Sequence, residues 1–456
     1  MDNLGLLDTV SVGYSIQCIS GALTITNNTF ITNQSTFINS YLSTVLLISN
    51  LTIYDITSDN NIFVIAETYL TLDNVAIDNL YTNGGRGKFI QVSFESHVVV
   101  SNIQYTNSNM KLIETFTSQM HISTLHMSNI SLTQYAIDFI RCHNIKIENV
   151  EIYDISTTKT SMMYMTKSSI NKIKNMTVNN INSTMLYILQ SSITLIDDIE
   201  VNDVAQSIHI KQSSIGMIQN SRIFWSGSSD ILYGGALHID NSNSSMQNLT
   251  LEHNIAQTGG AIHIGCDTYE ICQNNISSST FLNNTALKQG GAINYNFRRP
   301  DLLNNSFDFN GAAYGPIIAS YPARIVNSVA INEPIVLTNV ASGIAYHETI
   351  SMMLVDYDDQ VMNLVNNSHI KIVPVTINSK IKGVDYSVLT EGQAQFDNLQ
   401  FEYGPGKDNI KYIATCDLID SYKVSYLTLP TENSIDVSFR YCQPGEVIIN
   451  NETCSE

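Results

Sequence analysis

The chain has 456 residues, of which 43% are hydrophobic and 14% charged, and 41 acidic against 22 basic side chains give a formal net charge of −19. This apolar content excludes a disordered chain, and the length allows two or three domains with sizeable cores. The acidic excess argues against nucleic acid or an anionic membrane surface as a partner, because both require clustered Lys and Arg. Asn, Ser and Thr take the place of charge throughout the sequence.

A pattern of seven residues recurs through the first two-thirds of the chain. Its clearest copies are residues 50–56, 74–80, 149–155, 175–181 and 198–204, and successive copies start roughly 22 to 30 residues apart. Each copy also holds further short apolar runs with period-two alternation, which is typical of strands. Three short strands per copy cannot bury a core alone, but stacked coils can. The sequence therefore predicts an all-β parallel β-helix of about a dozen rungs.

The first residue of the pattern has a predicted structural role. Asn tolerates the left-handed backbone conformation that a sharp turn requires, and its amide can bond to the next copy along the stack. We therefore expect a ladder of turn residues, one per coil, in which a buried amide could not also carry a glycan. Its members are Asn50, Asn74, Asn149, Asn175, Asp198, Asn220 and Asn248.

The seven cysteines indicate an oxidising compartment. Cys266 and Cys272 enclose five residues, a length that suits a local disulfide, whereas the pairing of Cys18, Cys142 and Cys416 stays open. Many sequons arise by chance in this composition, but together with the cysteines they favour an extracellular or cell-surface glycoprotein. The sequons expected to carry glycans are Asn33, Asn129, Asn182, Asn243, Asn275, Asn283, Asn366 and Asn451.

The ends of the chain show neither a signal peptide nor a long apolar run that could cross a membrane. We therefore expect a piece of a longer protein that is secreted, or anchored by a segment outside this chain.

A sharper motif appears in the middle rungs. Gly-Gly-Ala-Leu/Ile occurs at 234–237, 259–262 and 290–293, and Phe-x-x-Asn at 30–33, 281–284 and 307–310. This pairing resembles the repeat of the polymorphic outer-membrane-protein family and of related β-helical surface proteins of protists. The resemblance implies a right-handed parallel β-helix with a cell-surface or adhesive role. The barrel of the bacterial family has no counterpart here.

The repeat stops after about residue 321, and longer alternating segments follow at 334–338, 351–355, 369–373 and 422–427. Their spacing suits an antiparallel β-sandwich. Residues 391–396 and 404–412 resemble late strands of bacterial-type Ig-like domains. The segment from Cys442 to Cys454 resembles the opening of a growth-factor-receptor-like Cys-rich repeat, which implies that these two cysteines pair. The expected domains are a β-helix (1–322), an Ig-like sandwich (323–441) and the start of a truncated Cys-rich repeat (442–456).

Candidate chemical sites are few, and each has a structural alternative. His209, His238 and His263 fall in one outward-facing column with Tyr164 and Tyr187, so they could bind a metal or simply stack. Asp356, Asp358 and Asp359 could hold calcium or form a turn. Asp197, Asp198 and Asp203 lack the Gly-His-Gly and basic residues of polygalacturonase-like sites, so we expect no catalytic residue and no cofactor.

The sequence therefore favours a non-enzymatic extracellular structural or adhesive protein that assembles with itself, with other surface or matrix proteins, or with glycans. The alternative is a carbohydrate-active enzyme or glycan-binding lectin on the same pectin-lyase-like fold.

Overall fold

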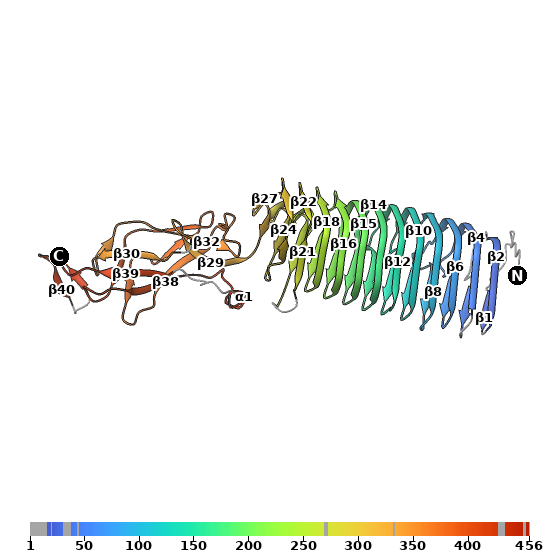
Figure 1. The fold of residues 1–456 in the computed structure, drawn as a ribbon, viewed down its shortest axis with the longest axis horizontal. Helices are drawn as coiled ribbons and strands as arrows, with labels where there is room; N and C mark the ends of the chain where they lie inside the picture. Colours follow the sequence, from blue (N-terminus) through green and yellow to red (C-terminus); the bar gives the residue numbers. More distant parts are fainter. Residues whose placement is uncertain are drawn as a thin grey trace. The chain divides into compact units, whose positions relative to one another are not determined.

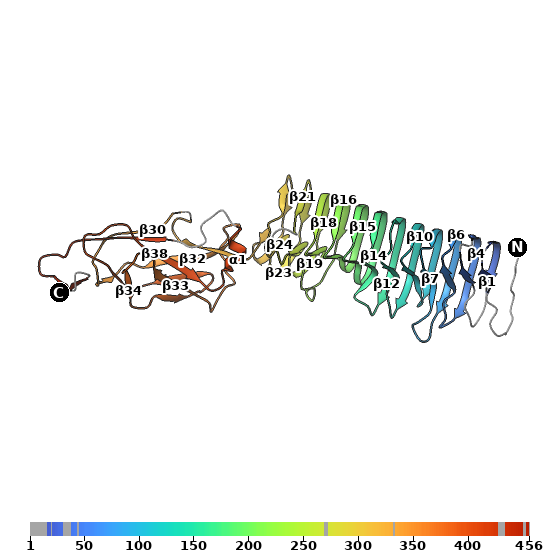
Figure 2. The same ribbon diagram turned by 90° about the horizontal axis from the view of Figure 1, so that it is seen from below.

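The computed structural model describes residues 16–19, 21–30, 38–42, 45–268, 272–331, 333–426, 434–449 and 453–455; within these, the side chains of residues 16, 18 and 27–30 are not described. Two compact units divide the chain, Met1–Ala312 and Ala313–Glu456. The first is a parallel β-solenoid of about 11 turns, as the sequence predicted. Figures 1 and 2 show its strands stacked from β2 onward.

Most turns of the solenoid contain one long strand that bends at residues with positive φ and so covers two faces. These strands are β2 (Ala22–Phe30), β4 (Val45–Thr57), β6 (Tyr69–Tyr81), β8 (His97–Ser108), β10 (Gln119–Leu132), β12 (Ile145–Thr157), β14 (Ser169–Leu189), β15 (Ser192–Lys211), β16 (Ser214–Phe224) and β18 (Asn243–Glu252). In the last turns the corresponding strands are the shorter β21 (Asn274–Ser277), β22 (Thr280–Leu282), β25 (Asp301–Leu303) and β26 (Ser306–Asp308).

Short strands form the third face. They are β1 (Ile16–Ile19), β3 (Ile38–Tyr41), β5 (Phe63–Ala66), β7 (Lys88–Ser93), β9 (Lys111–Phe116), β11 (Ile137–Ile140), β13 (Ser161–Thr166), β17 (Leu237–Asp240), β20 (Ile262–Gly265), β24 (Ile293–Tyr295) and β28 (Ile318–Ala319). The ends of β14 and β15 complete this face between β13 and β17. A separate three-stranded sheet contains β19 (Ile255–Thr258), β23 (Thr285–Gln289) and β27 (Gly311–Tyr314).

The core of the solenoid consists of columns of apolar side chains. Ile53 of β4 pairs with Ile77 of β6, and Ile77 pairs with Tyr105 of β8; all three are at most 1% exposed. Each buried side chain of this size contributes about 1.5–3 kcal/mol. The Phe-x-x-Asn motifs continue such a column, since the rings of Phe281 and Phe307 stack with centroids 4.8 Å apart.

The predicted ladder residues all have positive φ. Asn74 Nδ2 donates to Asn50 Oδ1 at 2.5 Å, and Asn175 and Asn248 donate in the same way to Asn149 and Asn220. These side chains are exposed, not buried as expected. They lie outside the coil because the left-handed residue points its Cβ away from the core. Burial therefore does not exclude glycosylation at the ladder positions, contrary to the expectation from the sequence.

The second unit contains several small sheets around one apolar core. The first sheet is β29 (Pro322–Asn327), β32 (Ile350–Asp356) and β36 (Gln393–Phe396), and the second is β30 (Ile335–Val340), β39 (Ser434–Phe439), β38 (Ile410–Cys416), β33 (His369–Pro374) and β35 (Tyr386–Val388). The third is β31 (Ala345–Tyr346), β37 (Leu399–Glu402) and β34 (Lys380–Lys382), and β40 (Val447–Ile449) pairs with β41 (Thr453–Ser455).

One predicted strand of this unit is wrong. Residues 422–427 were expected to be extended, but Ser421–Val424 form the short helix α1. The Asp420 side chain caps it by accepting a hydrogen bond from the Tyr422 backbone N–H, and a capped turn outweighs the local strand pattern.

Two disulfides close local loops, Cys266–Cys272 in the solenoid and Cys442–Cys454 in the second unit. Cys142 and Cys416 are free thiols, and the side chain of Cys18 lies outside the described residues. No helix among the described residues is long and apolar enough to span a membrane.

Candidate functional site: an amide cleft beside a column of rings and charges

The outward-facing positions of the third face form one continuous column in parallel register. Its members are Gln91, Glu114, Asp138, Tyr164, Tyr187, His209, His238, His263 and Asn294. Parallel in-register pairing places each side chain about 4.8 Å from the next. Tyr164, Tyr187 and the three histidines are therefore brought together in the order that the sequence predicts.

The rings of this column form an unbroken series of contacts, some of them stacked. The Tyr135 ring lies parallel to Tyr164 with centroids 4.7 Å apart, and Tyr164 and Tyr187 follow at 5.6 Å. His209 and His238 stack at 4.1 Å, while Tyr233 covers His263 at 4.4 Å. Two of the contacts are edge to face instead, because the Tyr187 and His209 rings meet at 64° and the His238 and His263 rings at 68°.

The histidines are more buried than expected for a solvent-facing column. His263 is only 6% exposed, and His209 and His238 are partly buried. Burial lowers the pKa of His209 and of His263 to about 4, and it lowers the pKa of His238 further, with help from the two neighbouring imidazoles. His209 Nε2 and His263 Nδ1 are buried without a hydrogen-bond partner.

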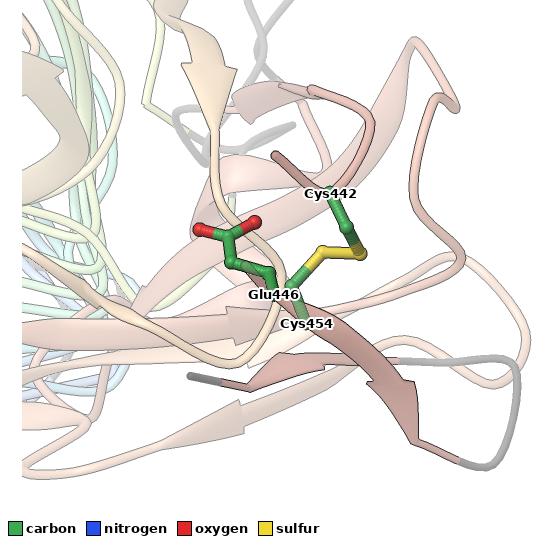
Figure 3. Close-up of side chains that lie close together, drawn as sticks. All are labelled: Cys442, Glu446 and Cys454. Carbon is green, nitrogen blue, oxygen red and sulfur yellow. A yellow bond between two sulfur atoms is a disulfide. The ribbon is translucent and has the colours of Figure 1, made fainter. Parts of the chain in front are cut away.

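The three imidazoles do not converge on a common point. Among the described residues, the one group of at least three metal-ligating side chains with ligand atoms within 4.8 Å of one another is Cys442, Glu446 and Cys454 (Figure 3). The two cysteines share a disulfide, and Arg440 donates to both Glu446 oxygens at 2.6 and 2.8 Å. Neither arrangement offers a metal the geometry it needs.

The acidic triplet of the second unit is also engaged in local contacts. Asp356 is buried and accepts hydrogen bonds from the backbone N–H groups of Ser320, Asp358 and Gln360. Arg324 donates to Asp359 at 2.5 Å. These contacts match the turn alternative, and calcium binding here stays an untested prediction.

A group of four charges lies at the other end of the column. Lys111 Nζ is 2.9 Å from Glu114 Oε1 and 3.4 Å from Asp138 Oδ2, and Lys88 pairs with the second Glu114 oxygen. Burial raises the pKa of Asp138, whereas for Glu114 the two lysines outweigh burial and lower the pKa. Asp138 Oδ1 is buried without a hydrogen-bond partner. This group could not be predicted from the sequence, because its members come from three different turns.

A cleft of about 660 Å³ lies at the turns that follow β6, β8, β10 and β12. We call it the amide cleft. No charged side chain is among the residues that line it, which are Asn79, Tyr81, Thr82, Asn83, Gly85, Asn107, Ser108, Asn109, Asn129, Ser131, Leu132, Thr133, Ser156 and Thr158.

One wall of the amide cleft is a long turn at residues 82–87. Asp59 holds it by accepting hydrogen bonds from Thr82 Oγ1 at 2.6 Å and from the Gly84 N–H at 2.7 Å, and these bonds lower the pKa of Asp59. Gly85 has φ 64° and lies so close to Thr133 that a Cβ would come within 2.5 Å of its Oγ1. Glycine is therefore required where two loops of different turns meet.

The floor and rim of the cleft carry amide and hydroxyl groups. Asn129 Nδ2 donates to Asn107 Oδ1 at 2.5 Å, so these amides are fixed in orientation. Ser131, Thr133 and Thr158 are exposed, and their hydroxyls make no hydrogen bond within the described chain. Tyr81 is 40% exposed at the edge. In the sequence, the glycine pair Gly84-Gly85 in a lengthened turn was the one signal that could have indicated this cleft.

The predicted glycosylation positions are placed as follows. Asn182, Asn243, Asn275 and Asn366 are exposed, and Asn283 is partly exposed. Asn129 lies within the amide cleft, and Asn33 and Asn451 lie outside the described residues. Attachment of glycans stays a prediction at all eight positions.

No family model and no curated protein matches the chain. The chain is similar to a double mutant of the tailspike protein of E. coli bacteriophage HK620 in complex with a pentasaccharide, with 10% identity over 86% of this chain and 84% of that one and a TM-score of 0.26. It is also similar to tailspike protein 2 of E. coli O157:H7 bacteriophage CAB120, with 9% identity over 87% and 66% of the two chains and a TM-score of 0.33. At these values the likeness is one of fold alone.

These findings correct the expected function. Solved structures to which the chain is similar include tailspike proteins, several of them in complex with a pentasaccharide or hexasaccharide. The expectation of a non-enzymatic structural or adhesive protein is withdrawn, and its carbohydrate-directed alternative stays a proposal. Of the resemblance to polymorphic outer-membrane proteins, only the parallel solenoid fold is retained.

Proposed function

We propose that this protein binds a neutral glycan in the amide cleft, in an extracellular setting consistent with its two disulfides. The observation that carries the proposal is the chemistry of the cleft, which joins amides and hydroxyls from neighbouring turns without any charged side chain. Its volume lies in the range of small-ligand sites.

The lining matches the groups that a sugar presents. Sugar hydroxyls both donate and accept hydrogen bonds, and so do the amides of Asn83 and Asn109 and the hydroxyls of Ser131 and Thr133. The ring of Tyr81 offers an apolar surface to the C–H face of a sugar, with its hydroxyl as a further polar contact. Because the cleft amides are already oriented by hydrogen bonds, little ordering is needed on binding.

The test compares the two tyrosines at the ends of β6. A glycan array identifies the neutral oligosaccharide bound best, and calorimetric titration then measures its affinity. Tyr81→Ala should weaken binding about fivefold or more, because an aromatic contact is worth about 1 kcal/mol beyond its buried area. Tyr69 is also exposed but lies outside the cleft, so Tyr69→Ala should bind like the unmodified protein. Equal effects of the two changes, or no binding of any neutral glycan, would contradict the proposal.

Cleavage of a bound glycan is a second candidate, favoured by one observation. Glu114 and Asp138 lie in register on adjacent turns, and their surroundings shift the two pKa values in opposite directions. Glycosidases use such a pair, one carboxyl group protonated and one ionised. A reducing-sugar assay that shows turnover lost in Asp138→Asn and Glu114→Gln would establish it; unchanged glycan chains would leave binding as the function.

A further inference from the structure

The edge of the solenoid that lines the amide cleft continues far beyond it. Asn129 occupies the same turn position as Asp154, Asn180, Asp203 and Trp225 on the following turns, since the residues beside them pair in register. All five have positive φ between 51° and 56°. Four steps of about 4.8 Å separate Asn129 from Trp225 by roughly 19 Å along the coil axis.

Trp225 is unusual for this turn position. Asn and Asp tolerate the left-handed conformation, whereas a bulky side chain adopts it at a cost. The indole nevertheless stays 58% exposed, although the His253 imidazole stacks flat against it at 4.2 Å and 3°. The exposed area therefore belongs to the other ring face and the edges. Burial in a core does not explain a tryptophan here.

Charged side chains lie beside the imidazole that stacks on this ring. Arg222 pairs with Glu252 at 3.1 Å, and His253 Nε2 is 3.5 Å from the other Glu252 oxygen. The guanidinium of Arg222 also lies over the Phe224 ring at 4.6 Å. A flat aromatic surface bordered by fixed donors and acceptors is suited to one face of a sugar ring and its hydroxyls.

We propose that the ligand is a long neutral polysaccharide that lies along this edge, with one part in the amide cleft and another stacked on Trp225. This inference rests on the proposed function and extends it from an oligosaccharide to a polymer. Between the two contacts the ligand meets the exposed side chains of Asp154, Asn180 and Asp203. Carboxylates accept hydrogen bonds from sugar hydroxyls but repel uronates, so the edge selects neutral over acidic polymers.

The experiment measures affinity against chain length for a series of one neutral oligosaccharide, from lengths that fill only the cleft to lengths that span the edge. The unmodified protein should bind the long members at least tenfold more tightly than the short ones. Trp225→Ala should abolish this gain while leaving affinity for the short members unchanged. Phe94 is a matched control, because it is also an exposed aromatic residue with positive φ but lies in another turn column; Phe94→Ala should behave like the unmodified protein.

The outcomes separate this inference from the function on which it rests. If short glycans bind and Tyr81→Ala weakens them, but length brings no gain or Trp225→Ala does not reduce it, the polymer proposal fails while glycan binding stands. If no member of the series binds, both fail. Tighter binding of a uronate polymer than of a neutral one of equal length would also overturn the inference.

Discussion

At the scale of single residues, the solenoid depends on polar side chains inside its turns. Ser96, Ser168 and Ser191 are buried, and each hydroxyl accepts a hydrogen bond from a backbone N–H of the preceding turn. Each also donates to a carbonyl of its own turn. Backbone groups at the turns are thereby satisfied without water. Cys142 stands in this series and donates through its sulfur to Thr115 O.

The serine ladder leads to a stability prediction. Ser191→Ala leaves the Ser168 backbone N–H buried without its acceptor, which should cost about 1–3 kcal/mol of unfolding free energy. The neighbouring Ser192 is exposed at the start of β15, so Ser192→Ala should change stability by less than about 0.5 kcal/mol. Urea unfolding of the two variants checks this, and equal stabilities would show that the ladder bond contributes nothing.

At the scale of elements, the stacked histidines on β15, β17 and β20 make the solenoid sensitive to acid. Burial lowers the folded-state pKa of His209 and His263 to about 4, below an unfolded value of about 6.5. The unfolded chain therefore binds more protons in this window, and stability falls as the pH falls from 6.5 toward 4. Burial is the largest cause of the lowered His209 pKa; it outweighs nearby Asp240, which favours protonation, and nearby Lys211 acts in the same direction as burial.

This leads to a pH prediction for the middle residue of the stack. Each histidine adds up to about 1.4 kcal/mol per pH unit to the slope of stability against pH. His238→Gln should flatten the slope between pH 6.5 and 5 by about that amount, measured by urea unfolding at each pH. His143 is an exposed histidine on the same solenoid, and His143→Gln should leave the slope as it is. An unchanged slope in His238→Gln would contradict the assigned burial.

The strands and their register could be predicted from the sequence, whereas the loops that form the cleft could not. The coil and the register of Tyr164, Tyr187 and His209 follow from repeat spacing, because one residue per turn faces outward at each position. The amide cleft does not, because it depends on where loops of unequal length, such as 82–87, meet residues of a later turn, such as Thr133. Likewise, no sequence motif indicates the contact of Lys111 with Asp138, because the two residues lie on different turns.

At the scale of the whole solenoid, parallel stacking converts a repeat in sequence into straight lines of like side chains. Asn and Asp along one edge become a strip of hydrogen-bonding groups, with the amide cleft and Trp225 on the same strip. Because this strip carries amides and carboxylates but no lysine or arginine at its turn positions from Asn129 to Trp225, its chemistry supports the proposal of a neutral glycan over an acidic one. The proposed binding site combines residues of several stacked turns, and no single repeat contains it.

The measurement that tests this account most directly is backbone hydrogen exchange of the intact protein, with and without a saturating neutral polysaccharide. We expect the glycan to slow exchange in the turns at residues 82–85, 131–133 and 156–158 and around Trp225, and to leave the third-face strands that carry Tyr187 and His238 unchanged. Slowed exchange along that ring column with no change at the amide cleft would contradict the account.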